Sequence, residues 1–271
     1  MFIPLTETHA IQSVAIAVRL GRAFDESAMA ALEAEHKKFR TELPKVERQE
    51  VFQFAVGFPP GPPPPVTRPI AFSAFRRDGS IDWQMKAEEN ALLVNCLSYT
   101  RWADVSVRAT SLLSHAAAAL RPKALPVTNV ILQYLDVFRW STKTSEYDLG
   151  LLLRPDSPYV PASVYSHKAS PLWHLHQGAY VADVPLKMPG RLLERVHLDA
   201  ALENGSYIVR VETFLQLDLA SPTSLREALF DRSSGHVTDV LNQMHHRSKE
   251  LLLSHITDEL AERIGLRVST K

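Results

Sequence analysis

The sequence predicts an α+β fold, in which helices pack on one face of a large, curved and mainly antiparallel sheet. Strand-like runs follow one another through tight turns at Asp78-Gly79 and Asn204-Gly205, and the helical runs stand before or after these groups of strands. Neighbouring strands joined by short turns pair antiparallel, so this order favours α+β over a doubly wound fold. We expect a single domain over residues 1–271. Two pseudo-repeated sheet-plus-helix halves, 1–122 and 123–271, are the alternative organisation.

The first half is expected to combine groups of strands with two helices. The apolar alternation at Val14, Ile16 and Val18 predicts the first strand, and Asp25 is a suitable N-cap for the first helix. The expected order is a strand over 11–20, a helix over 26–42, a strand over 50–58, three strands between 69 and 97 that turn at Asp78-Gly79 and Glu89-Asn90, and a helix over 101–120. A proline-rich run over 59–65 ends the strand before it, because proline cannot donate a ladder hydrogen bond.

The second half repeats this style without an obvious sequence repeat. The expected strands cover 127–140, 147–154, 172–186, 191–202 and 206–219. Ser221-Pro222 has the pattern of an N-cap followed by proline at the first helical position, which predicts a short helix through Phe230. A long closing helix is expected within 235–266.

The closing helix carries an apolar stripe that turns into an ionisable one. At 100° per residue, the stripe of Val237, Val240, Leu241, Met244, Leu251 and Leu252 continues into His255, Asp258, Glu259 and Glu262. Because the apolar side rotates away there, either the helix kinks near Ser254 or its two halves pack against different partners. The ionisable face could bind a divalent cation or a basic partner, and the alternatives are a solvated face or contacts to Arg and Lys side chains of the sheet.

Composition argues against several classes of function. Lys plus Arg and Asp plus Glu number 30 each, so no global field draws the chain to nucleic acid or anionic lipid. There is no glycine-rich phosphate loop and no G-x-S-x-G motif, and the single Cys96 lies in an apolar run that disfavours a thiolate. The sequence shows no secretory signal and no run of roughly 20 apolar residues, so we expect a cytoplasmic protein without a membrane partner. No motif indicates a cofactor.

His174 and His176 are the sharpest local candidate for chemistry. Alternate residues of a strand project from the same face, so the two imidazoles could share a metal ion. A metal site would still need a third ligand and supporting hydrogen bonds, and no carboxylate stands at a diagnostic spacing. The alternative is a polar strand face, with Trp173 and Leu175 on the apolar side.

Arg76 and Arg77 form a small basic cluster beside the Asp78-Gly79 turn. Together with Arg191 and Arg195 elsewhere in the chain, they permit a groove for single-stranded nucleic acid. No nucleic-acid motif accompanies them, and a solvated hairpin explains the two arginines at least as well.

Several stretches of the chain carry a family resemblance. They are VAIAVRL, WQMKAEENALLVNCLSYTRWADV, NVILQYLDVF and MHHRSKELLLSHITDELAERIGL. Within them, Tyr99-Thr100-Arg101-Trp102 matches the family's strand-to-helix passage, and Ile256-Thr257-Asp258-Glu259 follows a helix that contains His245 and His246. On these motifs the chain resembles a sporadically distributed family of uncharacterised bacterial proteins of about 250–270 residues. The resemblance implies a shared fold and brings no activity or catalytic residues.

Three functions from different classes follow. The preferred one is a non-enzymatic intracellular binding or assembly protein, whose sheet offers a groove or an edge to a protein partner, a second subunit or a small ligand. We prefer it because no acid, base and nucleophile stand out together. The second is a metal-dependent hydrolase that uses His174 and His176. The third is a nucleic-acid-associated or bacterial defence accessory component, suggested by the patchy distribution of the similar family.

Overall fold

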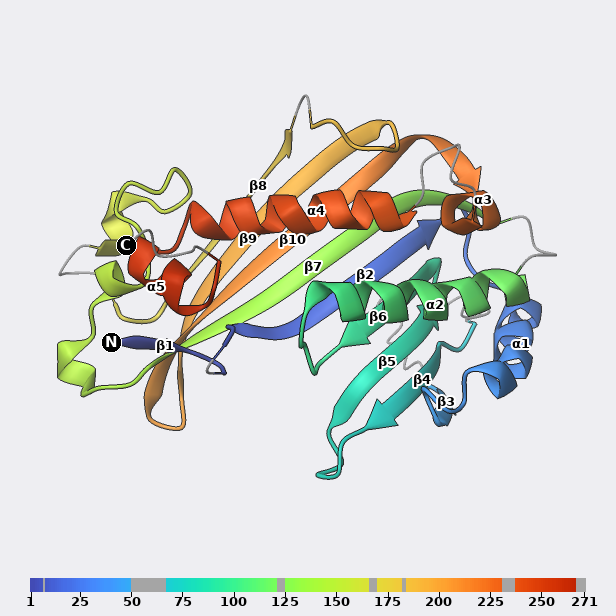
Figure 1. Cartoon of the computed structure of the whole chain (residues 1–271), viewed down its shortest axis with the longest axis horizontal. Helices are drawn as coiled ribbons and strands as arrows, with labels where there is room; N and C mark the ends of the chain where they lie inside the picture. The colour runs from blue at the N-terminus through green and yellow to red at the C-terminus, as the bar shows by residue number, and fades with distance from the viewer. Residues whose placement is uncertain are drawn as a thin grey trace, which may run out of the picture.

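A ten-stranded, mainly antiparallel sheet with helices packed against it forms the body of the protein (Figure 1). The computed structural model describes residues 1–6, 8–49, 67–120, 125–165, 170–181, 184–230 and 237–266. The strands are β1 (Phe2–Pro4), β2 (Ile11–Leu20), β3 (Lys45–Arg48), β4 (Ile70–Phe75), β5 (Ile81–Glu88), β6 (Ala91–Cys96), β7 (Pro126–Trp140), β8 (Trp173–Val181), β9 (Gly190–Glu203) and β10 (Ser206–Ser224). The helices are α1 (Glu26–Glu35), α2 (Trp102–Leu120), α3 (Leu225–Phe230), α4 (Val237–Leu253) and α5 (Asp258–Arg263). The predicted α+β class is confirmed.

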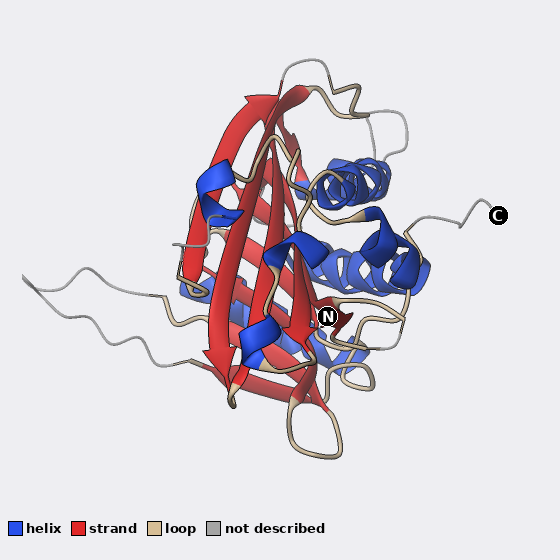
Figure 2. Ribbon diagram, turned by 90° about the vertical axis from the view of Figure 1, so that its left-hand side faces the viewer, coloured by secondary structure: helices blue, strands red, loops and turns tan. Residues whose placement is uncertain are grey.

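The strand order is arranged about the central pair β2 and β7. It runs β3-β4-β5-β6-β2-β7-β10-β9-β8, and β1 adds to β7. On each side, the chain leaves the central strand, starts a meander at the outer edge of the sheet and returns inward. The last strand of each meander therefore pairs with the central strand, β6 with β2 and β10 with β7. Each meander leads into a long helix, α2 or α4, and both helices lie on the same face of the sheet (Figure 2). Residues of both halves therefore meet under α2 and α4 at the centre of the molecule.

The predicted hairpin turns are all present. Gly79 and Gly205 have φ values of +84° and +76°, which glycine adopts without strain. Glu89 and Asn204 also have positive φ, near 50°, as tight two-residue turns require. These turns fix the registers of β4–β5, β5–β6 and β9–β10, and so decide which side chains face the helices.

The core lies between the sheet and the two long helices. Along β7, alternate residues Val130, Leu132 and Tyr134 are buried against the helices. A second cluster, under α5 and the end of α4, includes Phe138, Val211 and Ile256. The predicted apolar stripe of α4 is buried as a whole, including Leu251 and Leu252.

Two predicted elements are wrong for local reasons. The expected strand over 147–154 contains instead one short 3₁₀ turn, Leu149–Leu151, because the Asp148 carboxylate accepts a hydrogen bond from the Gly150 N–H (2.9 Å) and closes a turn. The helix expected from Ser221-Pro222 begins later, at Leu225, and β10 continues to Ser224. There the Glu227 N–H donates to Ser224 Oγ (3.1 Å) and the Ser224 N–H donates to the Glu227 carboxylate (3.2 Å), a reciprocal cap that fixes the start.

The closing helix breaks where its stripe changes. It ends at Leu253, and residues 254–257 leave the helix because the backbone around Leu153 competes for them: Leu153 pairs with Ile256, and the Arg154 N–H donates to the His255 carbonyl (2.7 Å). Helix α1 also ends earlier than expected, at Glu35, followed by a 3₁₀ turn over 36–38. The strand expected over 50–58 and the proline run over 59–65 lie outside the described residues.

Candidate functional site

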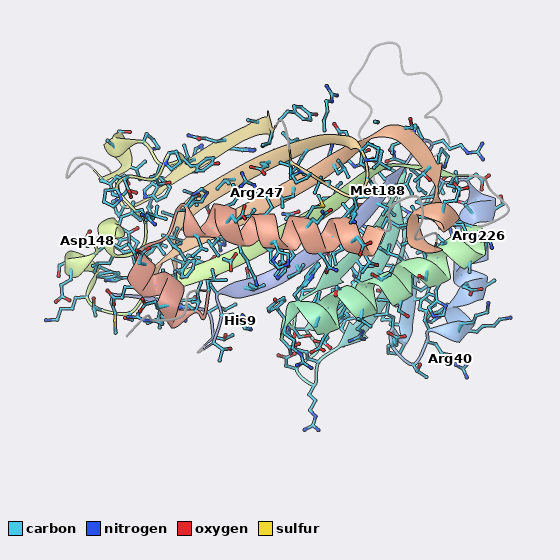
Figure 3. All side chains as sticks on the ribbon, turned by 45° about the horizontal axis from the view of Figure 1, so that its top comes forward. His9, Arg40, Asp148, Met188, Arg226 and Arg247 are labelled. Carbon is cyan, nitrogen blue, oxygen red and sulfur yellow. The ribbon has the colours of Figure 1, made fainter. Side chains whose placement is uncertain are left out.

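A cavity of about 300 Å³ lies between the centre of the sheet and the helices. The segment before β2, the passage from β6 into α2, strands β7 and β10, helix α4 and the end of α5 all contribute to its wall. Figure 3 labels His9 in the segment before β2, on the side of α4 that faces α2. The wall of the cavity is apolar at Ile11, Leu252 and Ile264, and polar at Asp136 and Thr213. The cavity therefore takes residues from both halves of the chain.

Asp136 is the most unusual residue of the cavity wall. It follows Tyr134 on the helix-facing side of β7, opposite Ile11 of β2 and Val211 of β10, and only 3% of its surface is exposed. Burial raises the pKa of its carboxyl group from 3.8 to about 7, and no hydrogen bond or neighbouring cation within the described part of the chain offsets this effect. A buried carboxylate is normally paired, so this one is costly to the fold.

Two further polar atoms on the same wall lack partners among the described residues. Thr213, which lies directly opposite Tyr134 on β10, is 1% exposed, and its Oγ1 has no hydrogen-bond partner. His9 lies within 3.2 Å of the Tyr99 carbonyl through Nε2, but its buried Nδ1 has no partner. Buried polar atoms are nearly always hydrogen-bonded in proteins, and these two of the six partnerless buried atoms among the described residues line one cavity.

Aromatic rings form the rest of the wall. Trp102 is half-buried, stacks on His245 with 4.5 Å between ring centroids, and donates from Nε1 to Asn242 Oδ1 (2.7 Å). The Tyr134 hydroxyl lies 2.7 Å from His245 Nδ1. Burial, followed by the nearby Lys249 and His246, lowers the pKa of His245 to about 3, so the imidazole is neutral at pH 7. Tyr99 completes the group, because burial raises its pKa to about 12 and keeps its hydroxyl protonated.

Two cations lie on the cavity wall. Arg101 is well exposed and pairs with Asp104, with 2.8 Å between Nε and the carboxylate. Lys249 of α4 is half-buried. Neither contributes to the pKa of Asp136, whose only cause of shift is burial. Within the described residues, no charged group therefore lowers the pKa of Asp136, although Arg101 and Lys249 line the same cavity.

His174 and His176 lie on the opposite face of the sheet, at its β8 edge. His176 stands opposite His197 with 5.6 Å between ring centroids, and His174 stands opposite Asp199. Trp173 and Leu175 pack on the apolar side, as the alternative interpretation expected. Within the described residues, no three His, Cys, Asp or Glu side chains gather closely enough to hold a metal ion. The metal site stays a prediction.

The continuous ionisable face expected at the end of the chain does not form. The break after Leu253 separates His255 from α5, so His255, Asp258, Glu259 and Glu262 do not share one helical face. His255 is fully buried against the Tyr159 ring, and burial lowers its pKa to about 4. Asp258 pairs with Arg154 and Glu259 with Arg263, while Glu262 is exposed.

Arg76 and Arg77 lie at the tip of the β4–β5 hairpin. Arg76 pairs with Asp82 of the same hairpin and donates to the Leu97 carbonyl just past β6, and Arg77 is exposed. Arg191 and Arg195 lie on the uncovered face of β9, where their guanidinium groups sit over the rings of Tyr180 and Phe214. The two pairs belong to opposite ends of the strand order and do not form one cluster.

The sequence did carry a signal for the cavity. Asp136 stands in the strand run VTNVILQYLDVFRW at a position in phase with Leu132 and Tyr134, which face the core. A carboxylate in phase with a buried face is the kind of exception that marks a site. The partners Thr213 and His9 are remote in sequence, and only the fold brings them to it.

Comparison with protein-family models and with curated proteins gives no relative from which a role could be transferred. Neither the models of protein families nor the curated proteins match the chain. No helix among the described residues has the length and apolar character needed to cross a membrane.

Proposed function

We propose that this protein binds a small molecule in the cavity between the sheet centre and helices α2 and α4. One observation carries the proposal. The buried Asp136 carboxyl, Thr213 Oγ1 and His9 Nδ1 belong to three separate segments, converge on one cavity and have no hydrogen-bond partner in the described residues. Pockets for small ligands are concave and mainly apolar, with a few convergent polar groups, and this cavity has that character.

The free-energy cost of unpaired buried polar groups also favours a ligand in the cavity. An unpaired buried polar group costs about 1–3 kcal/mol, and a charged one costs more, so a chain selected for stability alone would replace it. A ligand that supplies the missing partners converts this cost into binding free energy. Two other polar groups of the wall are already engaged, since His245 lies in hydrogen-bonding distance of Tyr134 and Trp102 donates to Asn242.

A ligand-binding role belongs to the non-enzymatic binding class that the sequence favours. No hydrogen bond between described residues joins an acid, a base and a nucleophile on the cavity wall: His245 is neutral with Nδ1 engaged by Tyr134, His9 Nδ1 has no partner, and Cys96 lies outside the wall. A protein partner, the metal-dependent hydrolase with His174 and His176, and the nucleic-acid or defence role stay alternative proposals.

Native mass spectrometry tests the proposed function. The protein is incubated with a small-molecule extract of bacterial cells, desalted, and compared with a Ser248→Phe variant, whose added ring occupies the cavity beneath α4. Ser248 is buried and lines the wall, so the substitution changes the cavity while leaving the sheet intact. Thr213→Val, which keeps the shape and removes the unpaired hydroxyl, serves if Ser248→Phe does not fold.

The expected result is an adduct of one small molecule per chain, lost in Ser248→Phe and weakened in Thr213→Val. An Asp199→Asn variant, altered on the opposite face of the sheet, should keep the adduct. Absence of any adduct on the wild-type protein, or an equal adduct on all variants, contradicts the proposal.

A further inference from the structure

The Asp136 carboxylate on the cavity wall limits the class of ligand that the cavity can bind. Resting on the proposed function, we propose that the molecule bound is a compact organic cation, whose ammonium group pairs with Asp136 among the rings of Tyr99, Trp102 and Tyr134. Charge, ring chemistry and size each support this class.

The groups around Asp136 determine which ligand charge the cavity favours. Its neighbours across the sheet are Ile11 and Val211, which are apolar. From α4 the wall includes His245, which is neutral because burial lowers its pKa, and Lys249, which is half-buried. Arg101, just before α2, is exposed and pairs with Asp104. A largely buried carboxylate without a paired cation is disfavoured, and a bound cation reduces that penalty. An anionic ligand would add to it.

The aromatic residues complete the recognition of a cation. The ring centroid of Tyr134 lies 6.4 Å from that of Tyr99 and 6.3 Å from that of Trp102, so three rings surround one part of the wall. An ammonium group within about 6 Å of a ring centroid is attracted by the negative ring face, and alkyl groups on the nitrogen pack against the same rings. Tyrosine hydroxyls that stay protonated do not compete with Asp136 for charge, and burial raises the pKa of both Tyr99 and Tyr134.

The size and the other polar atoms limit the ligand further. A cavity of about 300 Å³ is at the lower end of the range of small-molecule sites, so the cation must be compact. Thr213 Oγ1 and His9 Nδ1 offer additional hydrogen bonds to a hydroxyl or an N–H group of the same molecule.

A neutral ligand is the competing possibility. It would accept a hydrogen bond from Asp136 in the protonated form, and its affinity would then not depend on a positive charge. Pairs of molecules with the same shape, one with an ammonium group and one with carbon in place of nitrogen, separate the two possibilities.

The experiment is isothermal titration calorimetry at pH 8 with two such pairs. Choline is compared with 3,3-dimethylbutan-1-ol, and 2-phenylethylammonium with propylbenzene. The proteins are the wild type, Asp136→Asn, and the matched control Asp199→Asn, which changes a strand carboxylate on the opposite face that is paired with Arg210. Circular dichroism establishes that each variant is folded.

We expect at least one cation to bind the wild type about tenfold or more tightly than its neutral counterpart, the size of one desolvated charge pair. Asp136→Asn should remove this preference, and Asp199→Asn should keep it. Equal binding of cation and neutral molecule, or a preference that survives in Asp136→Asn, overturns the inference while leaving the cavity a ligand site. If no ammonium compound binds but the extract yields a neutral adduct, the inference fails and the proposed function stands. If neither experiment shows binding, both fail.

Discussion

Replacing Asp136 by asparagine should stabilise the protein, although Asp136 is the residue that we place at the centre of the site. The substitution preserves the shape of the side chain and removes its charge. In the absence of ligand, nothing in the described residues compensates that charge, because burial is the only cause of the raised pKa. The charge of Asp136 therefore lowers the free energy of unfolding of the wild-type protein, and the Asp136→Asn variant lacks this loss.

The magnitude follows from the pKa of Asp136. In the unfolded chain the carboxyl group titrates near 3.8, and in the folded protein near 7. Between these values the unfolded state has lost the proton that the native state still holds, so stability falls as pH rises from about 4 to 7 and is constant above that. Each pKa unit is about 1.4 kcal/mol, which gives a cost of about 4 kcal/mol above pH 7 and about 1.5 kcal/mol at pH 5.

Urea denaturation at pH 5 and pH 8 measures this cost. The stability gained by Asp136→Asn over the wild type should increase by about 2.5 kcal/mol between the two pH values. Titrations of other groups cancel in the comparison, because both proteins contain them. Asp199→Asn, with its partly exposed carboxylate paired to Arg210, should change stability by less than about 1 kcal/mol at both pH values. A gain for Asp136→Asn that is independent of pH, or a loss at pH 8, would refute the reasoning.

Four further predictions concern the framework of the site, each measured by urea denaturation or soluble yield. Trp102→Ala should cost about 3 kcal/mol, because its ring stacks on His245 and its N–H bonds to Asn242; a change under 1 kcal/mol would mean that the ring does not anchor α2. Leu251→Asp should abolish soluble expression, since Leu251 is 2% exposed; normal yield would show that α4 is peripheral. Arg247→Ala should cost about 2–3 kcal/mol by leaving the buried Glu194 carboxylate without its bidentate partner, and unchanged stability would count against that pairing (Figure 3). Glu227→Ala should cost about 1 kcal/mol, because the Ser224 N–H and hydroxyl lose the carboxylate that accepts from them, whereas Glu227→Gln keeps an acceptor oxygen and should retain most of the stability.

The sheet could be predicted because its signals are local. Asp78-Gly79 and Asn204-Gly205 specify tight turns by backbone geometry alone, and the strands on either side alternate in phase with them. The apolar stripe of α4 was equally readable, because a helix that covers a sheet needs one apolar face.

Errors arose where a local pattern was overridden by a hydrogen bond at short or long range. The apolar residues around Leu149 suggest a strand, but the Asp148 side chain closes a turn first. The kink near Ser254, one of the two alternatives that the sequence left open, is present as a break in the helix. Its cause could not be predicted, because the backbone near Leu153, about a hundred residues earlier, pairs with residues 255 and 256. No window of sequence contains both partners.

The candidate site was missed for the same reason. The site residues predicted from the sequence are close in the chain, His174 with His176 and Arg76 with Arg77, because such clusters can be recognised without a fold. The cavity instead joins His9, Asp136 and Thr213, which become neighbours only when β2, β7 and β10 pair. The one local sign was the charge of Asp136 in the core phase of a strand.

A high-resolution crystal structure of the protein, purified at neutral pH with the cell extract present, tests the central claim most directly. If a ligand occupies the cavity, we expect continuous density larger than a water molecule there, within hydrogen-bond distance of the Asp136 carboxylate and of Thr213 Oγ1. A structure in which Asp136 is paired with a protein side chain, or in which ordered waters alone satisfy Asp136, Thr213 and His9, would contradict it.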